Sequence, residues 1–148
     1  MSYSIPVFAC QIVREGRVRV DERIINNPSV AAAILWEHLA GVDREHFVVL
    51  FLTTRNRVTG VHTVSMGSLD MTVVHPREVF KAAILANAAA IIVGHNHPSG
   101  DPSPSPDDVA ISQKLVRGGE LLGIAVLDSL VLGDEGRYVS LQETGRLG

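Results

Sequence analysis

Two histidines separated by a single residue, His95 and His97, follow an apolar run in the middle of the chain. In an extended strand, alternate side chains point the same way with backbones roughly 6.5–7 Å apart, so both imidazoles can face one metal ion while Asn96 points elsewhere. Asp108 falls in the first turn of a predicted helix, where a carboxylate is favoured. Two histidines and one carboxylate leave a fourth position open for water, which is the arrangement of a catalytic zinc site.

Polar residues on a surface loop are the alternative interpretation of the same side chains, because an aspartate is common at a helix start whether or not a metal binds. The segment from Gly94 to Asp108, however, contains four prolines. Prolines stiffen a loop, so they would hold the third ligand in place at a lower entropic cost. The residue pattern therefore favours a metal site without excluding the alternative.

The fourteen residues HNHPSGDPSPSPDD, 95–108, resemble the JAMM metalloprotease motif, in which His-x-His-Pro and six further residues are followed by Ser-x-x-Asp. The surrounding sequence, from about residue 45 to residue 133, is specifically similar to the RadC family. The resemblance implies the MPN (JAB) fold, an α/β (α+β) fold with a mixed, curved sheet flanked by helices and related in architecture to the cytidine deaminases. It also implies that His95, His97 and Asp108 bind Zn²⁺ and that Ser105 steadies the oxyanion or the metal-bound water.

Enzymes of the JAMM type also use an upstream glutamate as general acid and base, and the resemblance places Glu45 in that role. The chemistry needs such a carboxylate, because the proton of the activated water must be accepted and passed to the leaving group. Glu78 is the rival, although a first-turn glutamate beside Pro76 is explained equally well by the helix N-terminus. Ser105 has a similar second interpretation as an ordinary helix N-cap.

Two departures from the RadC family restrict what the resemblance implies. Asp128 is followed by Ser129, where many RadC-like chains have a histidine, so any role of that histidine is absent or reassigned. About forty residues precede the core, and they show no helix-hairpin-helix pattern. DNA contacts attributed to that region of the family are therefore not carried over.

The preferred hypothesis is a zinc-dependent hydrolase that cleaves a peptide or isopeptide bond by metal-activated water, with a peptide or protein as substrate. The alternative is a DNA-repair or recombination accessory, or a partner-binding module, whose metal site is structural or vestigial. A net charge of −3 and a pI near 6.0 count against nucleic-acid binding. A zinc deaminase is rejected, because that chemistry needs His-x-Glu and Pro-Cys-x-x-Cys, whereas Cys10 is the only cysteine.

The composition of the 148 residues predicts one domain, 1–148, with ordinary globular hydrophobicity. The N-terminal sequence has no signal-peptide pattern, and no apolar run approaches the roughly 20 residues of a membrane span. We therefore expect a cytoplasmic protein without membrane contact. Nothing in the sequence indicates the oligomeric state.

Periodicity and cap residues predict how these side chains are positioned. Three helices are expected, beginning at Pro28, Pro76 and Pro106, the last with Ser105 as N-cap and Gly123 at its end. A hairpin that turns at Gly16 is expected over residues 5–20, and residues 142–148 are expected to fray. Further strands are expected over residues 46–52, 58–65, 88–94, 124–133 and 137–141.

Overall fold

The computed structural model describes residues 1–67 and 74–148. The predicted connection between the second strand and the second helix, residues 66–74, lies largely outside these described residues. The helices and strands, in chain order, are α1 (Pro28–His38), β1 (Glu45–Leu52), β2 (Val58–Gly67), α2 (Pro76–Leu85), β3 (Ala90–Asn96), α3 (Pro106–Leu122), β4 (Ala125–Leu132) and β5 (Tyr138–Ser140).

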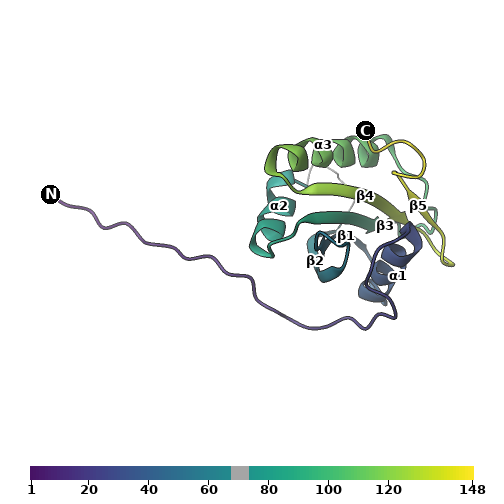
Figure 1. Cartoon of the computed structure of the whole chain (residues 1–148), viewed down its shortest axis with the longest axis horizontal. Helices are drawn as coiled ribbons and strands as arrows, with labels where there is room; N and C mark the ends of the chain where they lie inside the picture. Colours follow the sequence, from purple (N-terminus) through teal and green to yellow (C-terminus); the bar gives the residue numbers. More distant parts are fainter. Residues whose placement is uncertain (68–73) are drawn as a thin grey trace.

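The five strands form one mixed sheet in the order β2-β1-β3-β4-β5. The β3–β4 pair is parallel, and the β1–β2, β1–β3 and β4–β5 pairs are antiparallel. Helix α1 covers one face of the sheet, and α2 and α3 cover the other (Figure 1). The predicted fold class, a mixed sheet flanked by helices as in the MPN (JAB) fold, is confirmed.

The central strand β1 explains the continuous apolar sequence of residues 47–52. Alternate side chains of a strand point to opposite faces, and here both faces are covered by helices. Val48 and Leu50 therefore pack with α1, whereas Phe47 and Val49 pack with α2 and α3. All four are at most 3% exposed, so β1 is fixed within the core over most of its length.

The predicted helix ends are confirmed by their caps. The Asn27 side chain accepts a hydrogen bond from the Ser29 N–H, and Pro28 occupies the first turn of α1. Ser105 caps α3 as expected, and Gly123 ends it with a φ of +73°, a backbone angle that glycine adopts without strain. Among the described residues, no helix has both the length and the apolar character needed to cross a bilayer.

Two predictions for the ends of the chain are wrong. Residues 5–20 do not form a hairpin but run as an exposed, extended arm away from the sheet (Figure 1). The C-terminal residues 142–148 do not fray, since they turn back over the domain and bury Leu147. The Arg146 N–H donates to the Leu141 carbonyl and the Gln113 side chain donates to the Arg146 carbonyl, so these bonds and Leu147 together fix the tail.

Candidate metal centre

The end of β3, the start of β1 and the start of α3 meet at one end of the sheet. Because β1 and β3 are antiparallel, with Phe47 opposite His95, the first residue of β1 lies beside the last residues of β3. Glu45 is that first residue, and His97 follows Asn96 at the end of β3. The proline-containing loop then returns the chain to the same end of the sheet, where Asp108 lies in the first turn of α3.

Three of the predicted site residues lie within direct contact of one another. His95 Nε2 lies 3.2 Å from His97 Nε2 and 3.2 Å from Asp108 Oδ1. His97 Nε2 lies 3.2 Å from Asp108 Oδ2. Four ligands at the usual zinc bond length of about 2.0–2.1 Å would be separated by about 3.3 Å at the corners of a tetrahedron. The donor types and their spacing therefore fit a zinc ion.

Glu45 joins this group at a slightly greater distance. Its Oε1 atom lies 4.0 Å from His95 Nε2, and one ligand atom from each of Glu45, His95 and His97 lies within 4.8 Å of the others. These three residues could also hold a metal ion. Glu45 is farther from His95 than Asp108 is, so the distances favour Asp108 as the third direct ligand.

The centre is buried, although it consists of ionisable groups. His95 and Asp108 are each 1% exposed and Glu45 is 6% exposed. Among the described residues, Glu45 Oε1 and Asp108 Oδ1 have no hydrogen-bond partner, and neither has His95 Nδ1. Buried polar atoms without partners cost free energy. Binding of a cation would satisfy the orphaned oxygen of Asp108 directly and would place a positive charge beside the orphaned oxygen of Glu45.

The two imidazoles are held in orientations that suit ligation. His97 Nδ1 lies 2.8 Å from the Asp101 carbonyl oxygen, to which it donates its proton, and this leaves Nε2 free to bind a metal. The His95 ring stacks on Phe47 with 6.0 Å between centroids and 13° between planes. Both Nε2 atoms consequently face Asp108.

The buried charges shift one another's protonation. Burial alone would raise the pKa of Asp108, but its close contacts with His95 and His97 and their positive charge outweigh burial and hold that pKa well below its usual range. The hydrogen bond to Asp108 is also the main reason that the pKa of His97 is raised. For Glu45, burial dominates and raises the pKa to about 7. A carboxyl group that titrates near neutrality can both accept and return a proton.

Asn96 points away from the two histidines, as expected, and it has a partner that the sequence did not reveal. Its Oδ1 atom accepts a hydrogen bond of 2.8 Å from the His46 N–H, and its Nδ2 donates one of 3.1 Å to the Arg44 carbonyl. The side chain thus binds the backbone on both sides of Glu45. The only available sequence signal was its position between the two histidines.

Ser105 takes the N-cap position and forms a reciprocal pair with Asp108. The Ser105 hydroxyl accepts from the Asp108 N–H at 3.1 Å, while the Ser105 N–H donates to Asp108 Oδ2 at 2.8 Å. The cap therefore also orients the carboxylate toward the histidines. The hydroxyl itself is exposed beside the buried centre.

A buried pair of serines supports α3 behind the candidate ligand. The Ser112 hydroxyl donates to the Asp108 carbonyl at 2.8 Å and lies 2.8 Å from the hydroxyl of Ser129 on β4. Both serines are 1% exposed. Ser129 stands where many RadC-like chains have histidine, and here it contributes to a structural contact between α3 and β4.

Glu78, the rival proton acceptor, has a different environment. It lies in the first turn of α2 and forms an ion pair of 2.8 Å with Lys81, and both side chains are largely exposed to solvent. Hydrogen bonding to Lys81 lowers the pKa of Glu78. A glutamate with these properties is a poor proton acceptor at neutral pH, so Glu45 is the better candidate.

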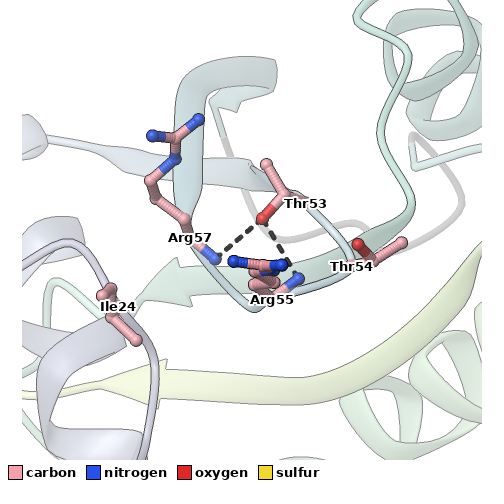
Figure 2. Close-up of a pocket in the computed structure, with 5 residues that line it drawn as sticks. All are labelled: Ile24, Thr53, Thr54, Arg55 and Arg57. Carbon is pink, nitrogen blue, oxygen red and sulfur yellow. Dashed lines mark hydrogen bonds between the residues drawn. The ribbon is translucent and has the colours of Figure 1, made fainter.

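A pocket of about 310 Å³ lies at the opposite end of β1, beside the turn into β2 (Figure 2). Ile24, Thr53, Thr54, Arg55 and Arg57 line it. The Thr53 hydroxyl accepts from the backbone N–H groups of Arg55 and Arg57, which shapes the turn (Figure 2), and both arginines are exposed. None of these residues belongs to the candidate metal centre.

The chain is similar in sequence to known proteins over most of its length. A family model described as a RadC-like JAB domain matches residues 25–146. A UPF0758 protein of Desulfitobacterium hafniense is 50% identical over 124 residues, and one of Methanosarcina acetivorans is 47% identical over 131 residues. These alignments cover 84% and 88% of the chain but only 54% and 57% of the two relatives. The chain thus spans just over half the length of these relatives.

Proposed function

The chain belongs to the RadC-like JAB domain family, and from that premise we propose that it is a zinc-dependent hydrolase that cleaves a peptide or isopeptide bond. The observation that carries the proposal is the buried contact among His95, His97 and Asp108: the two Nε2 atoms lie 3.2 Å apart, and each lies 3.2 Å from a different carboxylate oxygen of Asp108. The peptide-like substrate is inferred from the resemblance to JAMM metalloproteases.

In this proposal, His95, His97 and Asp108 hold the ion and leave a fourth position accessible. When bound, zinc would supply a Lewis acid that polarises the scissile carbonyl and makes a water molecule acidic enough to attack at neutral pH. The protein contributes fixed ligands in a buried setting, since the carboxylate is oriented by Ser105 and the His97 ring by Asp101.

Glu45 is proposed to accept the proton of the attacking water at Oε1 and to deliver it to the leaving nitrogen. Burial raises the pKa of Glu45 in the metal-free protein, and its carboxylate, lying beside the ion, could accept a proton and return it. Asn96 acts as a positioning residue, because it binds the backbone on both sides of Glu45 and so limits where the carboxylate can lie.

Ser105 is proposed to steady the oxyanion that develops on the carbonyl. Its hydroxyl oxygen already accepts the helix-capping bond from the Asp108 N–H, and the hydroxyl proton is still available to donate. Capping and oxyanion stabilisation are therefore compatible in one residue. A module that only bound a partner would not need a buried proton acceptor beside its metal ligands.

The test combines elemental analysis with hydrolysis assays on the wild type, Asp108→Asn and Glu45→Gln. We expect about one zinc per chain in the wild type, loss of zinc and activity in Asp108→Asn, and retained zinc without activity in Glu45→Gln. The probes are a fluorogenic peptide library and peptides linked through a lysine ε-amino group. Unchanged zinc content in Asp108→Asn would contradict the ligand assignment, and an active, zinc-loaded Glu45→Gln would contradict the proton-transfer role.

A further inference from the structure

The first 23 residues form an arm that leaves the domain without contacting the sheet over most of its length (Figure 1). Its apolar side chains lie in solvent, with Val7 97% exposed and Phe8 83% exposed. The other large apolar side chains of the arm that are exposed are Met1, Tyr3, Ile5, Ile12, Val13 and Val20. Soluble domains seldom leave so many large apolar groups uncovered in one segment, so the arm has the character of an interaction surface.

The sequence of the arm is typical of β-strands on both sides of Gly16. Tyr3, Ile5 and Val7 alternate with serine and proline, and Val18 and Val20 alternate with arginine. Period-two alternation and β-branched residues favour an extended strand paired along one edge. The arm is extended but pairs with no strand among residues 1–67 and 74–148, and an isolated two-stranded hairpin would be only marginally stable.

Strand β2 offers an unpaired edge that suits such a segment. It is the longest strand, lies at one end of the strand order, and among the described residues is paired only with β1. No residue of β2 is fully buried, and its sequence, VTGVHTVSMG, contains no lysine, arginine, aspartate, glutamate or proline. Those residues commonly protect an edge strand from pairing with another chain. The other edge strand, β5, has only three residues, and the C-terminal turns follow it directly.

The base of the arm already touches this edge. The Val58 N–H donates to the Arg23 carbonyl at 2.8 Å, the Ile25 N–H donates to the Asn56 carbonyl at 2.9 Å, and Ile24 pairs antiparallel with Arg57. On the N-terminal side of Arg23 the arm leaves the domain, and it does not pair with the rest of the outer edge of β2. The base of the arm, at Arg23, is thus adjacent to the start of β2, at Val58, and from there neither segment pairs with the other.

We propose that two copies of this chain exchange their arms, so that residues 3–21 of each copy add an antiparallel strand to the outer edge of β2 in the other. The arm runs away from its own sheet, and a second copy supplies the same edge in a symmetric arrangement. The arm has one more basic than acidic residue, whereas the remainder of the chain has an excess of acidic residues. Charge therefore favours docking of the arm on the acidic remainder of a chain, and the course of the arm away from its own sheet points to a second copy.

The first experiment measures the mass of the intact chain in solution by light scattering and sedimentation over a range of concentrations. We expect a dimer, and we expect Val7→Asp combined with Phe8→Asp to weaken dimerisation about tenfold or more, because two charged groups would be desolvated at the interface. Leu121→Asp is the matched control, since Leu121 is 88% exposed on α3 and lies outside the proposed interface. A monomeric wild type, or equal weakening by Leu121→Asp, would overturn the proposal.

The second experiment determines which molecule the arm contacts. One sample mixes a ¹⁵N-labelled Cys10→Ser chain with an unlabelled chain that carries a nitroxide on Cys10, the exposed and only cysteine of the protein. Exchange of arms predicts paramagnetic broadening of the β2 amides in the labelled chain, with Val61 and Met66 as reporters. A second sample carries the nitroxide and ¹⁵N in the same molecule. Broadening in this second sample alone would show that the arm folds onto its own sheet. Broadening in neither sample would exclude β2 as the partner of the arm.

Discussion

The two ends of β1 differ in the environment of their polar groups, which are buried at one end and exposed to solvent at the other. At Glu45 the strand begins within a buried cluster of carboxylates and imidazoles, several of whose atoms have no partner among the described residues. At Leu52 it leads into a turn with Arg55 and Arg57, which point toward solvent around a pocket (Figure 2). Water can solvate the arginines around this pocket. Desolvated groups that are held against one another mark the end of the sheet where chemistry is expected.

The largest expected difference between the two ends is in metal binding. His97→Ala removes a proposed ligand and should lower zinc affinity by roughly a hundredfold or more, by comparison with the 10–100-fold losses that follow even from changing groups around a ligand. Arg55→Ala at the other end should leave zinc content unchanged. Isothermal titration with zinc checks both variants, and equal affinities would remove the distinction between the two ends.

The pH dependence of stability in the metal-free protein is the next largest effect. The pKa of Glu45 rises from its ordinary 4.5 to about 7 in the folded protein, so the folded state holds this proton more tightly than the unfolded chain does. Stability due to this group is therefore fully present below 4.5 and falls, by about 3 kcal/mol at most, as the pH rises to about 7.

Glu45→Gln should make this decline shallower, and the exposed Glu37→Gln serves as the control. Urea unfolding in a chelator at several pH values provides the measurement. The charge of Glu45 contributes to the raised pKa of His97, so the difference between the wild type and Glu45→Gln reports the carboxyl group together with its coupling to His97. Parallel curves for these two proteins would show that Glu45 does not titrate as proposed.

A smaller effect is expected from Asn96→Ala, which removes both hydrogen bonds to the backbone around Glu45. We expect zinc content to be retained and kcat to fall about tenfold, because hydrogen bonds of this kind contribute on the order of 1 kcal/mol each. The acidic limb of the pH–rate profile should shift as the carboxylate loses its fixed position. A loss of stability with kcat and the pH profile unchanged would indicate a purely structural role.

The smallest expected change is that of Ser112→Ala, which leaves the Asp108 carbonyl and the Ser129 hydroxyl without their shared partner. Unfolding free energy should fall by about 1–2 kcal/mol, because both serines are buried. Ser103→Ala on the exposed loop is the control for thermal unfolding. An effect on zinc affinity larger than that on stability would place this contact nearer to the chemistry than we propose.

The sequence predicted those parts of the fold that depend on local signals. Proline in the first turn marks the starts of the helices, and Ser105 and Gly123 mark the two ends of α3, so these starts and the end of α3 were predicted. The strand predicted over residues 88–94, which the structure has as Ala90–Asn96, was evident from its apolar run because both faces of the sheet are covered. Likewise, the facing of His95 and His97 followed from the period of a strand.

What the sequence did not predict depends on contacts between distant residues. The bond from Asn96 to the backbone beside Glu45 spans about fifty positions and has no local signature. The same is true of Ser112 with Ser129 and of Leu147, whose burial fixes a tail that local composition marks as free. The arm over residues 5–20 has a hairpin sequence, but pairing needs a partner that the sequence cannot specify.

The positions of the candidate ligands along the chain have a consequence for folding. The ligands His95 and Asp108 come from β3 and α3, and Glu45 beside them comes from β1, so the centre cannot exist until the sheet has formed and α3 has docked. An ion held there would bind the native state and not the unfolded chain, which makes free zinc a variable of the folding equilibrium. Each tenfold rise in free zinc above the dissociation constant would add about 1.4 kcal/mol to the unfolding free energy. The melting temperature of the protein would thereby report the zinc supply around it.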